Sequence, residues 1–159
     1  MRLFLAALVL LPLAAQAQDP FARFVTPEAT AAARQLAIQN ITQGDCGDGP
    51  ASCVPATEAE LAEPPISMTM ADAAMQTGLV SALMQWCALD WEARSFLPFM
   101  VFHRDMMDMN ERQQTLMGLV HGIQQQRILK ALGSQNCSPE MRRKIHAMAP
   151  GPERDPDVN

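Results

Sequence analysis

Tyrosine is absent from this 159-residue sequence, and no segment alternates polar and apolar residues for long enough to predict a β-strand. The sequence also lacks Gly-x-Ser-x-Gly, His-Glu-x-x-His, Ser-x-x-Lys and any glycine-rich phosphate loop. Neither Cys-x-x-Cys nor Cys-x-x-Cys-His occurs, which argues against a redox dithiol and against covalent haem. These absences predict an all-α protein, a small single-domain bundle of four to six helices, and they make enzymatic function unexpected.

Basic residues are in the minority. The sequence has 12 Lys and Arg against 17 Asp and Glu, a formal net charge of −5. Removal of a leader that contains only Arg2 among the charged residues would leave 11 against 17, or −6. An acidic surface repels nucleic acid and anionic lipid, so neither is expected as a partner.

The first 17 residues have the pattern of an export signal. Arg2 precedes the apolar run 3–11, and Ala15-Gln16-Ala17 offers a small-x-small site for cleavage between Ala17 and Gln18. No later apolar run reaches the length of a membrane span. We therefore expect a periplasmic or secreted protein with residues 1–17 as signal peptide, one helical domain over 18–149 and a flexible tail over 150–159.

Four cysteines remain after the leader, an even number that suits disulfides in an oxidising compartment: Cys46, Cys53, Cys87 and Cys137. Three pairings are possible. We favour Cys46–Cys53, which closes a small loop within the connector 44–66, together with Cys87–Cys137. The second bond would close a loop of about fifty residues and stabilise the fold by roughly 3–5 kcal/mol. The spacing of the cysteines does not favour a zinc site.

Capping patterns predict where most helices begin: Thr26-Pro27-Glu28, Thr57-x-x-Glu60, Thr69-x-x-Asp72, Asn110 with Gln113, and Ser138-Pro139-Glu140. The corresponding helices extend to about residues 41, 63, 89, 132 and 148. A further helix, 96–109, should follow a break near residues 95–97, because Pro98 cannot continue an established helix.

Two of these helices have informative faces. On the helix after Thr69, one face carries the apolar residues Ala71, Met75, Gly78, Leu79, Ala82, Trp86 and Leu89. Its opposite, polar face carries Thr77, Ser81 and Gln85.

The segment 116–123 is apolar nearly all round, which places its helix in the middle of a bundle. There, Gly118 and Gly122 should let a neighbouring backbone approach closely. His121 should be a neutral core residue, hydrogen-bonded to a backbone carbonyl or a carboxylate.

The best candidate for a metal or cofactor site is one side of the helix 96–109, which carries Met100, His103, Met106 and Met107. Arg104, Asp105 and Asp108 should face away from it. Thioether and imidazole groups suit Cu(I), and a Met/His pair also ligates non-covalent haem. Methionine is equally a flexible core filler, and that is the interpretation we favour. No cofactor is therefore expected, with copper or haem as the alternative.

The fifty-residue separation of Cys87 and Cys137 resembles that of small helical acid-stress chaperones of the bacterial periplasm, in which one disulfide joins two helical segments. Cys137-Ser138 leads into a short basic helix that contains Met141-Arg142-Arg143-Lys144. The similarity covers about residues 86–148, and the long helix before Cys87 departs from that pattern. It implies a chaperone-like factor. The leading hypothesis is an exported, non-enzymatic helical protein that acts by protein–protein interaction, with partner and oligomeric state undetermined.

Overall fold

The computed structural model describes residues 22–44 and 53–149, and within these ranges it contains helices and no strand. The six α-helices are α1 Pro27–Gln39, α2 Glu58–Ala62, α3 Met68–Trp86, α4 Leu97–Met106, α5 Glu111–Leu132 and α6 Pro139–Met148. Short 3-10 helices, Ala22–Phe24 and Ile41–Gln43, flank α1, and a π-helix, Glu92–Phe96, precedes α4. The predicted all-α fold is confirmed. The expected signal peptide 1–17, the tail 150–159 and Cys46 lie outside the described residues.

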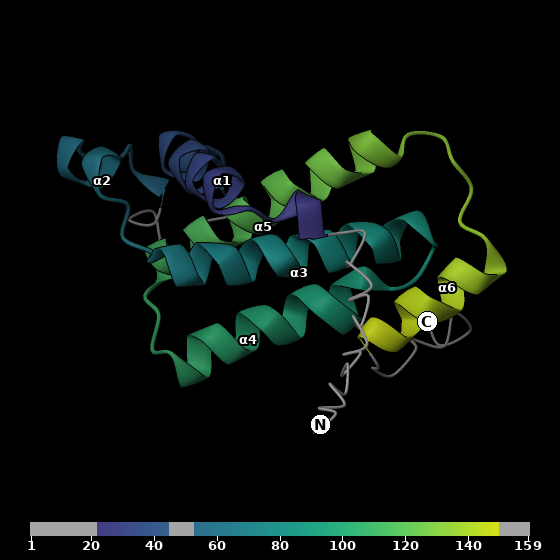
Figure 1. Cartoon of the computed structure of the whole chain (residues 1–159). Helices are drawn as coiled ribbons and strands as arrows, with labels where there is room; N and C mark the ends of the chain where they lie inside the picture. The colour runs from purple at the N-terminus through teal and green to yellow at the C-terminus, as the bar shows by residue number, and fades with distance from the viewer. Residues whose placement is uncertain (1–21, 45–52, 150–159) are drawn as a thin grey trace, which may run out of the picture.

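The helices are arranged around α3 and α5, which lie side by side (Figure 1). α1 packs against both of them, whereas α4 lies along the opposite side of α3 and also contacts α5. α6 packs against the C-terminal end of α3. The predicted central place of α5 is therefore confirmed. Within the described ranges, no helix is both long and apolar enough to cross a membrane.

Most of the predicted caps are present. Thr26 accepts a hydrogen bond from Ala29 N, Thr57 and Asn110 each form a complete capping box, and Ser138 caps α6. The cap predicted at Thr69 is wrong. The side chain of Ser67 accepts from Met70 N instead, because Ser67 is the first capping hydroxyl after Pro64-Pro65 and its use lengthens α3.

No full break separates the π-helix from α4. The amide of Leu97 donates to Glu92 O, which continues the helical path with one wider turn, and Pro98 falls in the first turn of α4. Pro98 has no N–H to donate, and the wider turn directly before it accommodates this gap in the helical hydrogen bonding. The predicted break near residues 95–97 is thus corrected to a π-helical turn.

α3 is buried on more sides than predicted. Ser81, expected on an outward polar face, has 0% exposure because the π-helix covers that side of α3 while α5 covers the other. Thr77 is half-buried and donates to Ala73 O, and only Gln85 of the three predicted polar positions is exposed. Leu36 of α1, by contrast, is an apolar residue that is 45% exposed.

The close approach of two helices depends on a glycine of α3. A Cβ added at Gly78 would lie 2.5 Å from the carbonyl oxygen of His121 on α5. A Cβ at Gly118 or Gly122 would meet nothing within 4 Å. A glycine does permit a close approach of two helices, but it is Gly78 of α3 and not, as predicted, Gly118 or Gly122 of α5.

His121 joins α3, α5 and the π-helix in one buried cluster. Its Nε2 lies 2.9 Å from Ser81 Oγ, and Ser81 Oγ donates to Ser95 Oγ at 3.0 Å. The rings of Trp91 and Phe96 lie 6.0 and 4.5 Å from the imidazole, centroid to centroid. His121 is 2% exposed, and this burial lowers its pKa from 6.5 to about 4. The predicted neutral core histidine is confirmed, but the predicted partner is wrong: His121 contacts a hydroxyl group and not a backbone carbonyl or a carboxylate.

The disulfide Cys87–Cys137 ties the end of α3 to the start of α6, as predicted, with the two Cα atoms 5.1 Å apart. Two arginines strengthen this junction. Arg142 of α6 donates to the carbonyls of Cys87 and Ala88, and the buried Arg94 donates to those of His146 and Ala149. Both guanidinium groups thus satisfy carbonyls at the C-terminal end of a helix.

Cys53 is disulfide-bonded as well. Its predicted partner, Cys46, lies outside the described residues, so the pairing Cys46–Cys53 stays a prediction.

We predict that Gly78→Ala lowers the free energy of unfolding by about 2 kcal/mol or more, because the methyl group collides with the backbone of α5. The matched variant Gly118→Ala should raise it by ~0.5–1 kcal/mol, since alanine favours a helix and meets open space. Urea unfolding of both variants measures the difference. Equal effects of the two substitutions would contradict the assigned contact.

A second prediction concerns pH. Between pH 6.5 and about 4 the unfolded state binds a proton at His121 that the folded state does not, so stability falls as the pH drops through this range. The loss attributable to His121 is roughly 3 kcal/mol. The variant His121→Phe should lack this component when both proteins are unfolded in urea at pH 7, 6, 5 and 4. If the free energies of unfolding of the two proteins fell in parallel with pH, His121 would not be the cause of the loss of stability.

Candidate interaction surface

α4 has two different faces. On its inner face Phe99 and Met100 are half-buried against the core, and His103 is 9% exposed. The outer face exposes large apolar side chains, and we call these the α4 patch: Leu97 at 41%, Val101 at 45%, Phe102 at 52%, Met106 at 72% and, at the C-cap, Met107 at 55%. Five of the ten large hydrophobic side chains that the described residues expose therefore lie on one short helix.

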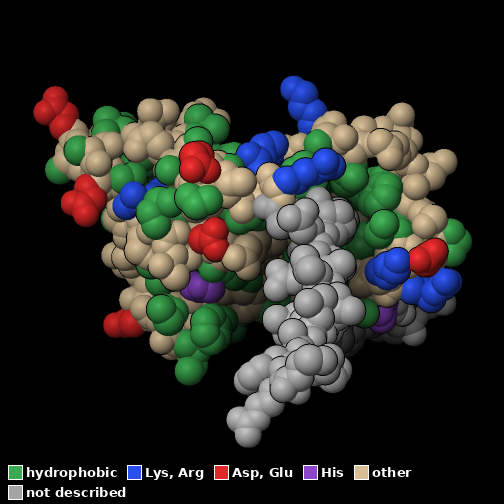
Figure 2. Space-filling model, viewed as in Figure 1, with side chains coloured by type: hydrophobic (Ala, Val, Ile, Leu, Met, Phe, Trp, Pro, Cys, Tyr) green, Lys and Arg blue, Asp and Glu red, His purple; other side chains and the backbone are tan. Residues whose placement is uncertain are grey.

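The patch follows from helical geometry. Residues four apart lie one above the other on a helix, so Leu97 and Val101 form one row and Phe102 and Met106 an adjacent row. Figure 2 shows hydrophobic side chains gathered along the lower edge of this view, where Figure 1 places α4. The other five exposed apolar residues are distributed over several elements: Leu36, Val54, Leu61, Met68 and Met148.

An ion pair lies at the C-terminal part of the patch. Arg104 donates to both carboxylate oxygens of Asp105, at 2.7 and 3.3 Å. This hydrogen bonding lowers the pKa of Asp105 and raises that of Arg104. Because both side chains are about half exposed, the pair contributes little to stability, but it neutralises the only basic group on α4 apart from its histidine.

The four predicted metal ligands lie in two different environments. Met100 and His103 are on the inner face, whereas Met106 and Met107 are in the exposed patch. The His103 ring lies between Phe99 and Phe102, with centroids 4.3 and 5.3 Å away, and its Nδ1 lies 2.9 Å from Phe99 O. In the described part of the chain, no three His, Cys, Asp or Glu residues are grouped as a metal site.

The surface positions of Leu97, Val101 and Phe102 were not predicted from the sequence. The outward positions of Arg104, Asp105 and Asp108 were predicted correctly, and all three residues are exposed. Their outward position was itself a usable signal, because Val101 precedes Asp105 by one turn and therefore lies on the same side of the helix.

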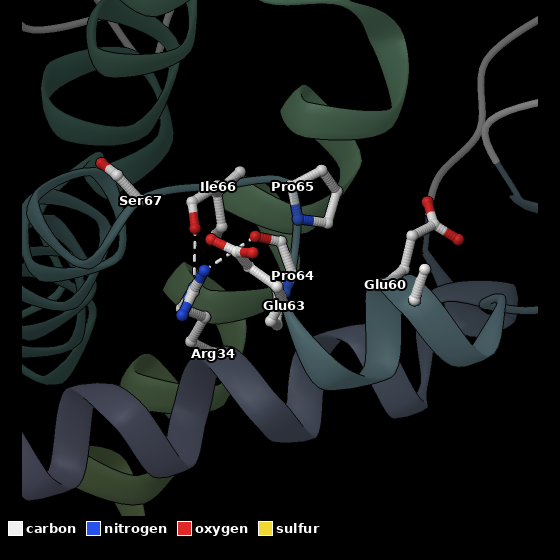
Figure 3. Close-up of a pocket in the computed structure, with 8 residues that line it drawn as sticks. Arg34, Glu60, Glu63, Pro64, Pro65, Ile66 and Ser67 are labelled. Atoms are coloured by element: carbon white, nitrogen blue, oxygen red, sulfur yellow. Dashed lines mark hydrogen bonds between the residues drawn. The ribbon is translucent and has the colours of Figure 1, made fainter.

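A hollow of about 510 Å³ lies between α1, α2 and the start of α3 (Figure 3). Arg34 donates from Nε and Nη2 to the carbonyls of Ile66 and Pro64, at 2.6 and 2.7 Å. Glu60 is bound by Arg112, which lowers the pKa of Glu60 to about 2. The polar groups at this open hollow thus attach the segment before α3 to α1 and α5, and we interpret it as part of that attachment.

Ser81 and His121 are a hydroxyl and an imidazole in contact, the combination that nucleophilic catalysis uses. Ser81 is 0% exposed, and the third member of the chain of hydrogen bonds is the hydroxyl of Ser95, not a carboxylate that would orient the imidazole. We therefore interpret the cluster as packing that holds the π-helix, and with it α4, in place.

The chain matches no known protein family, no curated protein and no solved structure. A function must therefore be argued from the molecule itself, and the α4 patch is the feature that supports such an argument.

Proposed function

We propose that this protein acts by binding another protein through the α4 patch, as an accessory or chaperone-like factor and not as an enzyme. The observation that carries the proposal is the exposure of five large apolar side chains on one helix. A contiguous apolar area of this kind on a folded protein commonly marks an interaction site. Methionine and phenylalanine suit that role, since aromatic residues anchor interfaces and the flexible thioether adapts to a partner.

The inner face of α4 supports the proposal because it fixes the helix. Phe99 and Met100 pack on the core, and the π-helix directly before α4 is held by the hydrogen bond between Ser95 and Ser81. A patch on an anchored helix can bind with little loss of conformational freedom.

We further propose that the protein works in the periplasm or outside the cell. The disulfide Cys87–Cys137 forms and persists in an oxidising compartment, and the export signal expected over residues 1–17 agrees with that location.

Site-specific cross-linking tests the proposed surface. A photoreactive amino acid at position 102 should give a cross-linked complex of defined mass in the bacterial periplasm, whereas the same residue at position 36 should not. The double variant Val101→Ser with Met106→Ser should reduce the yield of that complex at least fivefold. Leu36→Ser is the matched control, because Leu36 and Val101 are equally exposed at 45%. Equal cross-linking from both positions, or an undiminished yield in the double variant, would contradict the proposal.

Cu(I) binding by His103 with the methionines of α4 is a second candidate function. One observation favours it: the contact of His103 Nδ1 with the carbonyl of Phe99 requires an Nδ1–H donor, so the lone pair of a neutral ring lies on Nε2. Met100 and Met107 are one helical turn before and after His103, at the spacing that brings side chains together. The described residues offer no comparable observation for haem.

Competition with a Cu(I) chelator measures this second candidate. His103→Ala should weaken Cu(I) binding at least tenfold, and Met107→Leu should weaken it to a smaller degree, because one thioether ligand is lost. Met148→Leu on α6 is the control, since Met148 is similarly exposed at 48% but remote from His103 in sequence. Binding that is unchanged in His103→Ala would eliminate the site.

A further inference from the structure

The charges around the α4 patch point to the chemistry of the partner. Building on the proposed function, we infer that the patch binds a basic amphipathic helix: a segment of the partner with apolar residues on one side and Lys or Arg at the edges of that side. Three features support this inference: the pairing of the charged groups near α4, the uneven distribution of charge, and the length of α4.

Acidic side chains near both ends of α4 are not neutralised. Glu92 lies in the π-helix before α4, and Asp108 and Glu111 follow its C-terminal end; all three are exposed. The ion pairs within the described ranges are Arg104–Asp105, Arg112–Glu60 and Lys144–Glu140, and none of them uses these three carboxylates. Their charge is therefore presented to whatever approaches the patch.

The basic residues of the same region are committed to other groups. Arg104 is paired with Asp105, and Arg112 is paired with Glu60. Arg94 keeps its charge, because it donates to the neutral carbonyls of the C-terminal end of α6, but it is only 5% exposed. Cationic groups on a partner therefore meet no exposed guanidinium of these three that lacks a carboxylate.

Charge is unevenly distributed over the face of the molecule that Figure 2 shows. Most acidic side chains on this face lie toward the left of the view, the end at which α2 and the start of α3 lie, and most basic ones lie toward the opposite, basic end, although each end also has a charge of the other sign. The basic end carries Arg127 and Lys130 of α5 and Arg143 and Lys144 of α6. A basic segment is therefore attracted to the C-terminal end of α4, which lies away from α6 and is followed by Asp108 and Glu111.

The dimensions of α4 favour a helical segment. Its ten residues extend over about 15 Å, which three or four turns of a partner helix can follow. A second copy of this chain fits less well, because symmetric pairing through α4 would bring Glu92, Asp108 and Glu111 of both copies together. Anionic lipid is repelled by the same carboxylates.

Three synthetic peptides of about 14 residues, roughly 20 Å when helical, test the inference. The first has Leu and Phe on one side and Lys at the edges, the second has Glu in place of each Lys, and the third keeps the Lys composition but scrambles the apolar side. Binding is measured by fluorescence anisotropy at 50 and 300 mM salt, and two-dimensional NMR of the labelled protein identifies the contacted residues.

The Lys peptide should bind at least tenfold more tightly than the Glu peptide at low salt and should shift the resonances of Val101 and Phe102. The preference should decrease at high salt. The triple variant Glu92→Gln, Asp108→Asn, Glu111→Gln should reduce it at least threefold. Arg143→Gln with Lys144→Gln on α6, away from the C-terminal end of α4, is the control and should leave it unchanged.

Other outcomes overturn the inference, and they separate it from the proposed function. Equal binding of the Lys and Glu peptides at α4 would remove the charge preference while leaving the interaction surface in place. Binding of the scrambled peptide as tight as that of the Lys peptide would show recognition of charge without an apolar face. Failure of both amphipathic peptides to contact α4 would overturn the inference and the proposed function together.

Discussion

The structure depends on the contact of α3 with α5 at Gly78. Because Gly78 has no side chain, the backbone of α3 can lie against the carbonyl of His121, where a Cβ would be 2.5 Å away. One turn further along α3, Ser81 then reaches the imidazole of His121 at 2.9 Å. Ser81 in turn donates to Ser95 of the π-helix. A single close approach therefore sets both the central helix pair and the attachment of the next element.

That attachment explains why the α4 patch is exposed. The π-helix continues directly into α4, so the orientation fixed at Ser95 turns Phe99 and Met100 toward the core. The disulfide Cys87–Cys137 and the hydrogen bonds of Arg94 hold α6 at the end of α3 that is near the π-helix. Once the inner face of α4 is packed, its outer rows have no neighbour within the described part of the chain.

The sequence was a good guide to features that act within one helical turn or through one kind of chemistry. The caps at Thr26, Asn110 and Ser138 and the pair Cys87–Cys137 were predicted correctly, because capping needs only neighbouring residues and oxidised cysteines need only each other. The roles of Ser81 and Gly118 were predicted wrongly. Which side of a helix meets a neighbour is decided by the packing of several helices, and a polar hydroxyl can be buried when another polar group satisfies it.

At the candidate site, too, the sequence did not show which side of a helix meets a neighbour. We predicted one Met/His side on the helix 96–109 and interpreted its methionines as core. Met100 and His103 do face the core, but Met106 and Met107 are exposed, so that interpretation is wrong for these two. A helix that is apolar on opposite sides normally lies between neighbours. α5 meets this condition, since α1, α3 and α4 all pack against it. Within the described residues α4 has two apolar faces and only one of them is covered. This difference from α5 is the reason why we propose that a partner covers the other face.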